Sequence, residues 1–433
     1  MTGLSWNRIP QVQPQHRKWI SSQAELPDVL GSVSDNVLAY GNGRSYGDVC
    51  LTAGTQLMCR GLDRFIAFDK HNGILRCESG VTLAEVLALT APQGWFLPCT
   101  PGTRYATVGG ALANDVHGKN HHVAGSFGHH VRAFELLRSD GSRLECRPDF
   151  NTPFFAATVG GLGLTGLISW VELQLMPVSN EWMWAESVRF QNLEEFWALN
   201  VAAEAVSPYA VAWIDCLSEG KNQGRGILLT ARHAGIQAEL PVFREKPKRV
   251  PFDPPFSLVN RLSLTSFNAL YYRQPTRPQG GLMHYVPYFY PLDAISDWNR
   301  IYGRRGFYQY QCVIPPEASA AAVAELLNAI ARSGQGSFLA VLKTFGDRPA
   351  AGMLSFPRPG ATLALDFPDK GEQTLRLFTE LDAIVAAAGG ALYPAKDARM
   401  SASLFRSGFP HWERFSDFID PAFSSHFRQR VML

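Results

Sequence analysis

Residues 41–48 read GNGRSYGD and directly follow a short apolar run at residues 37–40. The run has the composition of a β-strand that enters a loop. Three glycines close together free the backbone to approach a ligand and to direct N–H groups at phosphate oxygens. A tight turn without a ligand explains the same glycines equally well. The spacing G-x-G-x-x-x-G differs from the G-x-G-x-x-G fingerprint of dinucleotide-binding domains.

That fingerprint does occur elsewhere, at Gly161, Gly163 and Gly166. It predicts a Rossmann site only where a strand precedes it and a helix follows it. Residues 153–158 make a poor strand, and residues 167–176 alternate like a strand that ends at Pro177. We therefore reject NAD binding on a Rossmann domain.

A third glycine-rich stretch, residues 97–122, reads LPCTPGTRYATVGGALANDVHGKNHH. It places His117, His121 and His122 within six residues. Lys119 lies between them and repels a cation, and neither a carboxylate nor a cysteine completes a usual ligand set. We expect no metal site here and interpret the polar side chains as ligand-facing groups on a loop.

The composition is that of a globular protein: 433 residues, of which 46% are hydrophobic and 12% aromatic, a length that fits two domains. The net charge of +2 gives no overall attraction to nucleic acid. No secretory signal and no apolar run of ~20 residues is found, so a cytoplasmic location is expected. The seven cysteines are odd in number and form no C-x-x-C pair, which argues against a disulfide framework.

Two helices are indicated by spacing, at residues 83–89, with Gly94 at the expected stop, and at residues 318–332. Tryptophan and proline become common after Pro177. We predict a first domain at 1–178, a second at 179–390 and a C-terminal segment at 391–433. Residues 241–277 mix aromatic with basic side chains, which suits an anionic membrane interface or a polyprenyl phosphate. A disordered, solvated loop is the alternative.

Several motifs together resemble the flavin-binding oxidoreductases of the vanillyl-alcohol oxidase type, and among these the decaprenylphosphoryl-ribose oxidases. They are GNGRSYGD, the stretch at 97–122, GSFGHHV at 125–131, TVGGLGLTG at 158–166 and YPAKDAR at 393–399. The resemblance covers nearly the whole chain. It implies an α+β fold, in which a two-subdomain FAD-binding (PCMH-type) domain is built from both chain ends and an α+β substrate domain is inserted between them.

The resemblance also implies a set of FAD-binding residues, with the pyrophosphate on the first glycine loop. This set comprises Gly41, Asn42, Gly43, Arg44, Ser45, Tyr46, Gly47, Gly102, Thr107, Val108, Gly109, Gly110, Asn114, Asp115, Val116, His117, Ile168 and Tyr393. Many relatives attach FAD through a histidine in the first loop. Arg44 occupies that place here and cannot form the bond, so we expect non-covalent FAD.

The implied reaction is oxidation of the C2′ hydroxyl of a polyprenylphosphoryl ribose, the first half of an epimerisation to the arabinose form. A short-chain NAD-dependent keto-reductase would complete it, and peripheral contact with the inner face of the membrane is expected. Lys396 would stabilise developing charge, and Gln311 and Lys343 would orient the sugar or phosphate. Tyr46 and His117 would lie at the flavin edge. His117, Tyr46 and Lys396 are each able to accept the proton, and the sequence does not choose among them.

Ala364 stands where the best-known relatives have a cysteine, so chemistry that uses that thiol is absent. From the residues alone, Gln311, Lys343, Asp366 and Lys396 would be read as solvated polar side chains. Two other functions remain open: an aldonolactone or alditol oxidase of the same superfamily, and a non-catalytic flavin- or lipid-phosphate-binding protein.

Overall fold

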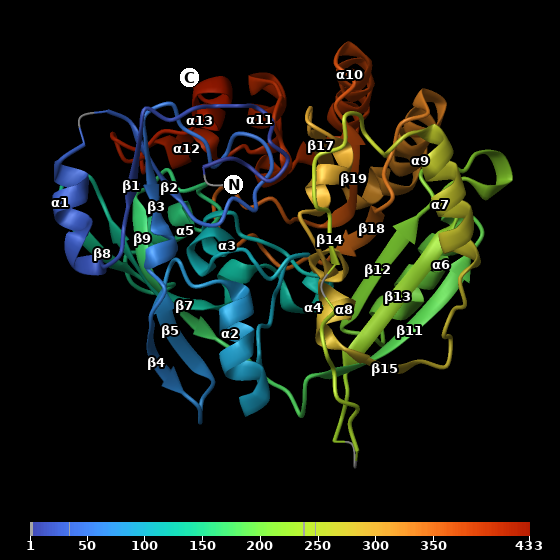
Figure 1. The fold of residues 1–433 in the computed structure, drawn as a ribbon, viewed down its shortest axis with the longest axis horizontal. Coiled ribbons are helices and arrows are strands. Elements are labelled where there is room, and N and C mark those ends of the chain that lie inside the picture. Colours follow the sequence, from blue (N-terminus) through green and yellow to red (C-terminus); the bar gives the residue numbers. More distant parts are fainter. Residues whose placement is uncertain (1–2, 34, 237–238, 247) are drawn as a thin grey trace.

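Two antiparallel β-sheets, each with its own helices, organise the chain in the computed structural model (Figure 1). The structure describes residues 3–33, 35–236, 239–246 and 248–433. The first sheet has five strands in the order β4-β5-β9-β7-β8: Phe65–Asp69, Ile74–Glu78, Leu167–Gln174, Val131–Leu137 and Arg143–Cys146. Mixed helices and antiparallel sheets confirm the α+β fold class.

A small parallel sheet precedes the first sheet in the sequence, and the glycine loop follows one of its strands. Its strand order is β1-β3-β2, with bounds His16–Trp19, Thr55–Met58 and Val37–Tyr40. The helices of this half are α1 (Leu26–Gly31), α2 (Leu83–Thr90), α3 (Val108–Ala113), α4 (His121–Ala124) and α5 (Thr152–Thr158). Strand β2 was predicted from the sequence, and residues 41–48 follow it directly.

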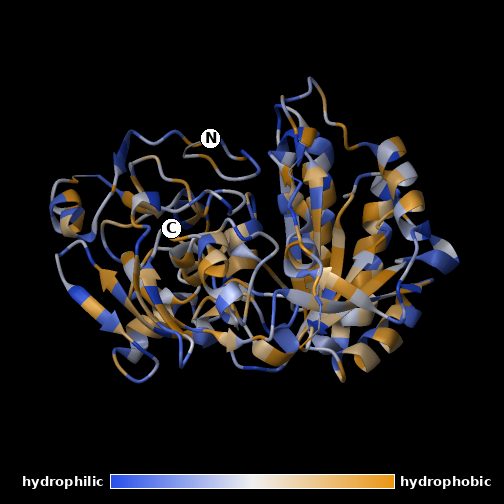
Figure 2. Cartoon of the chain, turned by 60° about the horizontal axis from the view of Figure 1, so that its bottom comes forward, coloured by the Kyte–Doolittle hydropathy of each residue, from blue (hydrophilic) through white to orange (hydrophobic). Residues whose placement is uncertain are grey.

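The second sheet has eight strands in the order β15-β11-β13-β12-β18-β19-β17-β20. Their bounds are Gly281–His284, Trp182–Phe190, Gly226–His233, Tyr209–Ile214, Ala340–Phe345, Gly360–Pro368, Phe307–Ile314 and Ala391–Leu392. Helices α6 (Leu193–Glu204), α9 (Pro316–Ser333) and α10 (Glu372–Ala387) pack against it. The strands are largely hydrophobic beneath these helices (Figure 2).

The remaining helices and strands lie outside these three sheets. Helices α7 (Arg261–Arg273) and α8 (Tyr285–Phe289) precede β17, and two short strand pairs join β6 (Trp95–Phe96) to β10 (Met176–Pro177) and β14 (Lys248–Arg249) to β16 (Ile295–Ser296). Helices α11 (Ala402–Gly408), α12 (Trp412–Ser416) and α13 (His426–Val431) end the chain. No helix in the described ranges is both long and apolar enough to cross a bilayer.

The C-terminal segment returns to the first glycine loop. The N–H of Val37 donates to the carbonyl of Ala422 at 2.8 Å, and the N–H of Ser424 donates back to Val37 at 3.0 Å. In the glycine loop that follows β2, the N–H of Tyr46 donates to the carbonyl of Ala395 at 2.9 Å. Both chain ends therefore build the region around residues 37–47.

The helix predicted at residues 83–89 is confirmed, and both of its ends carry the expected signals. Thr82 and Glu85 form a reciprocal capping box at the start of α2, and Gly94 adopts a left-handed φ of +82° after its end. Residues 153–158, interpreted as a poor strand, belong to helix α5. The G-x-G-x-x-G loop thus follows a helix and precedes strand β9, the reverse of the Rossmann order.

The cysteine prediction is also confirmed. All seven cysteines are free; six are buried and Cys50 is partly exposed. They act as small core residues rather than as cross-links.

Candidate active site

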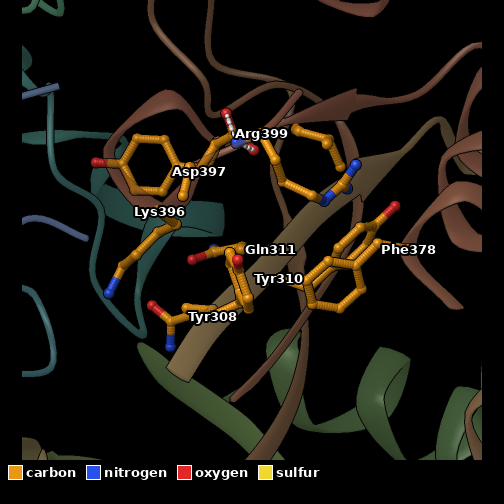
Figure 3. Close-up of a pocket in the computed structure, with 11 residues that line it drawn as sticks. Tyr308, Tyr310, Gln311, Phe378, Lys396, Asp397 and Arg399 are labelled. Carbon is orange, nitrogen blue, oxygen red and sulfur yellow. Dashed lines mark hydrogen bonds between the residues drawn. The ribbon is translucent and has the colours of Figure 1, made fainter. Parts of the chain in front are cut away.

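A row of polar side chains lies on the face of the eight-stranded sheet opposite helix α10. Tyr310 points to α10, where its ring centroid lies 5.4 Å from that of Phe378. Because side chains alternate along a strand, Gln309 and Gln311 point to the other face. Lys396 and Gln311 accordingly lie on one side of β17, and Phe378 and Arg399 on the other (Figure 3).

Strand register extends this row across three strands. Gln309 pairs with Asp366, Gln311 with Ala364, and Lys343 with Thr362. Directly opposed residues of antiparallel strands share a face. Ala364, which replaces the cysteine of the resemblance, therefore lies beside Gln311 in the middle of the row.

His117 is held at both ring nitrogens by this row. The Nζ of Lys343 lies 2.9 Å from Nδ1, and the side-chain amide of Gln311 lies 3.0 Å from Nε2. Lys343 also donates to the carbonyl of Gly118, and Gln311 donates to the hydroxyl of Thr362 at 3.2 Å. Both neighbours of the ring are nitrogen donors, Nζ of Lys343 and Nε2 of Gln311, so the imidazole accepts a hydrogen bond at whichever ring nitrogen carries no proton.

Burial sets the charge of this group. It lowers the pKa of His117 well below its ordinary value, and the nearby Lys343 lowers it further. Burial also lowers the pKa of Lys343 to about 7. The imidazole is therefore neutral, while the Lys343 ammonium titrates close to physiological pH.

Lys396 and Tyr46 bring the two chain ends together at the same site. The Nζ of Lys396 lies 3.9 Å from the centroid of the Tyr46 ring. Burial lowers the pKa of Lys396 to about 8, and the carboxylate of Asp366 acts in the opposite direction. A cation is thus kept in a poorly solvated place, where its field on a neighbouring anion is strong.

The pocket in Figure 3 opens between β17 and the segment that carries Lys396. Its enclosed volume is about 10 Å³, which is room for roughly one water molecule. Gln309, Gln311, Tyr393 and Lys396 are among the residues that line it. The pocket therefore joins the polar row to Lys396.

The first glycine loop fits a phosphate-containing cofactor. Gly43 and Gly47 have φ values of +60° and +68°, and a Cβ atom on Gly47 would lie 1.6 Å from the carbonyl oxygen of Asp397. Glycine is therefore required for the loop to pack on the C-terminal segment. Within the described part of the chain, no acceptor takes the N–H groups of residues 42–45. Free N–H groups in such a loop are suited to bind a diphosphate.

Two buried polar atoms near this loop also lack partners among the described residues: Nε of Arg44 and Oδ1 of Asn114. The guanidinium carbon of Arg44 lies 4.3 Å from the ring centroid of Trp6 and 5.3 Å from that of Tyr105. It offers a buried cation to a diphosphate, and Asn114 offers an acceptor to an N–H of the flavin ring. Buried groups of this kind are normally paired, so they fit a bound FAD.

Other residues expected at the cofactor have identifiable partners of their own. The N–H groups of Val108 and Gly109 donate to Val81 and Ser79, and Thr107 caps helix α3 through the N–H of Gly110. The carboxylate of Asp115 is buried and accepts from Gly128 and Ser355. These residues shape the chain around the site. The same holds for Tyr393, whose hydroxyl donates to the carbonyl of Asn114.

The remaining expected positions lie on the same elements. Asn42 donates from its side chain to the carbonyl of Tyr105, and Val116 accepts the N–H of Phe127. Ile168 is buried on β9, and a Cβ atom on Gly102 would meet no atom within 4 Å. Their contact with FAD stays a prediction, as it does for Gly41 and Ser45.

The solvated interpretation of the later polar residues is wrong. Gln311, Lys343 and Asp366 are 6%, 7% and 3% exposed, and Lys396 is only partly exposed. Pairing between distant strands buries them, and no local pattern reports it. Sequence reasoning also missed Thr362 and gave Asp366 no role; the period-two spacing of Gln309 and Gln311 was the available signal.

Comparison with known proteins agrees with this geometry. Residues 15–147 match the model of an FAD binding domain. The chain is 36% identical over 417 residues to the decaprenylphosphoryl-β-D-ribose oxidase of Mycolicibacterium smegmatis, covering 92% of this chain and 89% of that protein. It is 27% identical over 178 residues to the L-gulonolactone oxidase of Mus musculus, covering 40% of each. It is 34% identical over 109 residues to the Δ(24)-sterol reductase of Homo sapiens, covering 25% of this chain and 21% of that protein.

The first of these similarities extends over nearly all of both proteins. Such coverage at this identity shows common family membership, whereas the two shorter matches do not extend along the whole chain. The chain therefore belongs to the decaprenylphosphoryl-β-D-ribose oxidase family and is an FAD-dependent oxidoreductase.

Proposed function

We propose that this enzyme oxidises the C2′ hydroxyl of a polyprenylphosphoryl ribose to the 2′-keto sugar. The single observation that carries the proposal is the polar row with Lys396 at its edge, in a chain similar over 92% of its length to an oxidase named for that substrate. When bound, FAD supplies the acceptor for the hydride of the carbinol carbon. The protein supplies orientation and charge.

Each side chain has a distinct part in this reaction. The Lys396 ammonium stabilises negative charge that develops on the substrate oxygen. Lys343 and Gln311 fix the His117 ring from both sides, and their remaining polar atoms orient the sugar or its phosphate. Tyr46 and His117 border the flavin. Because the positions are set by buried contacts, little reorganisation is needed during the reaction.

Isotopic substitution of the sugar tests the position of oxidation. We expect deuterium at C2′ to slow anaerobic reduction of the bound FAD several-fold, and deuterium at C3′ to leave it unchanged. A water-soluble aldonolactone or alditol, tested in parallel, should leave the flavin oxidised. Reduction by the lactone together with no response to polyprenylphosphoryl ribose would establish the alternative oxidase activity. A flavin that no alcohol reduces would indicate a binding protein.

FAD is held without a covalent bond in this proposal, since Arg44 stands at the position of the linking histidine. We further propose that residues 1–178 and 391–433 form the FAD-binding domain and that residues 179–390 form the substrate domain. The bond from Tyr46 to Ala395 and the packing of Gly47 on Asp397 support the pairing of the two chain ends. Epimerisation also needs reduction of the keto product, and a short-chain NAD-dependent keto-reductase is the enzyme class for that step.

A surface on the substrate domain supports peripheral membrane contact. Four exposed apolar side chains occur within residues 252–262: Phe252, Phe256, Leu258 and Leu262, at 69%, 69%, 47% and 78% exposure. Gly303 packs against the backbone of Phe256 and so brings two exposed arginines beside it. The cations of this apolar–cationic surface are Lys248, Arg249, Arg261, Arg304 and Arg305.

The buried side of the same segment reaches the active site. Val259 and Tyr302 pack in one cluster with Tyr46 and Phe307, and the rings of Tyr302 and Phe307 stack at 4.2 Å. Aromatic side chains flanked by cations bind anionic lipid surfaces. A lipid-linked sugar could thus enter the site while its polyprenyl chain stays at the membrane.

Vesicle binding tests this surface. The protein should co-sediment with anionic phosphatidylglycerol vesicles and not with neutral phosphatidylcholine vesicles, and salt should weaken the binding. Replacement of Phe252 and Phe256 by serine should abolish it. The matched control replaces Val201 and Val206, which are 71% and 79% exposed at the end of α6. Equal loss in the two variants, or no binding by the wild type, would reject the membrane contact.

A further inference from the structure

Asp366 is a buried carboxylate with an unused oxygen. Its residue is 3% exposed, and no donor among the described residues reaches its Oδ1 atom. Gln309 lies directly opposite on β17, and its Oε1 atom is likewise buried without a partner in the described ranges. Two residues that face each other across the strand pair therefore each have a buried acceptor oxygen without a donor in the described ranges, although the Gln309 side chain also hydrogen-bonds to the Asp366 carboxylate.

Such a pair is costly unless a ligand completes it. A buried acceptor that gives up water without gaining a hydrogen bond destabilises the protein, and a charged acceptor does so more strongly. A sugar offers hydroxyl donors of the kind that both oxygens need. Asp366 lies on the same face as Gln311, two residues from Ala364 along β19. The unused oxygens are thus placed where a substrate hydroxyl is expected.

The groups around Asp366 influence the pKa of its carboxyl group. Lys396 approaches from the C-terminal segment, Tyr46 from the glycine loop, Tyr302 from the segment before β17, and Gln309 from β17 itself. Burial raises the pKa of Asp366 to about 7, and the Lys396 ammonium acts in the opposite direction. A base whose pKa lies near the working pH is suited to accept a proton and to release it again.

We propose that Asp366 accepts the proton of the substrate hydroxyl, an inference that rests on the proposed oxidation. The O–H bond breaks and its proton passes to Oδ1 of Asp366. The C–H bond breaks as well, and its hydrogen leaves with the electron pair as hydride to the bound FAD. The carbon–oxygen double bond forms from the electrons of the O–H bond. Asp366 then returns its proton to solvent.

The other three candidate bases are less suited to this step. Both ring nitrogens of His117 already have partners, Lys343 and Gln311, and its pKa is held low by burial. The Tyr46 hydroxyl has a pKa raised by burial well above 10, so it keeps its own proton. Lys396 carries the positive charge that stabilises the oxyanion. Among the titratable side chains named here, Asp366 has an acceptor atom that no donor in the described ranges reaches.

Asp366→Asn tests the proposal against a matched control, Asp369→Asn. Asp369 follows the end of the same strand, is partly exposed and accepts the N–H of Gly371. We expect Asp366→Asn to slow reduction of FAD by polyprenylphosphoryl ribose by at least about 100-fold, and to abolish the acidic limb of the pH–rate profile. FAD content and binding of a 2′-deoxy analogue should stay within about threefold of wild type. Unchanged rate and pH profile in Asp366→Asn would overturn the proposal.

An infrared titration of the holoenzyme provides a readout without turnover. The wild type and Asp369→Asn should show a protonated carboxyl band that disappears as the pH rises through about 7. That band should be missing in Asp366→Asn. A carboxylate at position 366 that stays ionised down to pH 5 would overturn the proposal, since it could not hold the proton. Because this titration needs no substrate, its outcome is independent of whether the enzyme oxidises a polyprenylphosphoryl ribose.

Discussion

The Nζ atom of Lys396 lies 3.9 Å from the ring centroid of Tyr46, although the two residues come from opposite ends of the chain. The backbone enforces this meeting, because the N–H of Tyr46 donates to Ala395 and Gly47 packs directly on Asp397. Folding of the C-terminal segment onto the glycine loop is thus a condition for the charge at the site. Several measurable consequences depend on that contact.

Loss of the Lys396 charge should lower the chemical rate more than substrate binding. We expect Lys396→Met to reduce the rate of FAD reduction by about 100- to 1000-fold, because a cation beside a developing oxyanion acts mainly in the transition state. Anaerobic stopped-flow absorbance measures this rate. Lys370→Met, a partly exposed lysine in the turn after β19, is the control and should retain wild-type rates. Equal rates in both variants would remove Lys396 from the mechanism.

Arg430 should be required for stability and for retention of FAD. Its guanidinium lies 2.8 Å from Oδ1 of Asp48 and 2.8 Å from Oδ2 of Asp397, and both carboxylates are buried. Arg430→Met removes the guanidinium that these two buried carboxylates share, which costs about 3–5 kcal/mol of unfolding free energy. Urea denaturation and the FAD-to-protein absorbance ratio measure the two effects.

An exposed ion pair provides the control for that prediction. Arg376 and Glu372 lie 3.7 Å apart on α10, with side chains that are 78% and 89% exposed. Arg376→Met should change the unfolding free energy by less than about 0.5 kcal/mol. A comparable loss in both variants would show that the buried network around Asp48 has no special role.

Lys343 should make stability depend on pH. Its pKa is about 7 in the folded protein because burial disfavours the ammonium, against about 10.4 in the unfolded chain. Between these values the unfolded chain binds more protons, so stability rises with pH. Relative to Lys343→Met, the wild type should therefore gain stability from pH 7 to pH 10, at about 1.4 kcal/mol per pH unit. Thermal unfolding of both proteins measures it, and parallel curves would contradict the buried, depressed lysine.

Denaturation should release all of the flavin. Arg44 cannot bond covalently to FAD, so acid precipitation should leave a colourless pellet and a yellow supernatant. Replacement of Arg44 by methionine should weaken FAD binding about tenfold or more, since a buried cation that faces a diphosphate is lost. Equilibrium dialysis measures the change. Colour that stays in the pellet would mean that another residue links the cofactor.

Local sequence signals predicted several helices and strands correctly, because the residues that mark the ends of these elements lie close together in the sequence. Helix α2 starts at the Thr82–Glu85 capping box and stops before Gly94, all within one short stretch of sequence. The glycine loop at 41–48 was likewise readable, because strand β2 and the glycines are adjacent. Residues 153–158 do not match a strand pattern because they form helix α5. Pro153 in the first turn of that helix is the local signal for it.

The polar row could not be read in this way. Gln309 and Gln311 share a face by simple alternation, but only pairing with β19 brings Asp366 and Thr362 beside them. Lys396 reaches the row because β20 pairs with β17. Register between strands far apart in sequence depends on the whole fold, so the burial of Asp366 was outside the reach of local patterns.

Anaerobic mixing of the purified flavoprotein with polyprenylphosphoryl ribose tests the central claim most directly. The visible flavin absorbance should be bleached by one equivalent of the sugar, with one equivalent of the 2′-keto product formed. A protein that stays colourless after incubation with FAD would contradict the account. A yellow protein would also contradict the account if polyprenylphosphoryl ribose failed to bleach its flavin and a soluble aldonolactone bleached it.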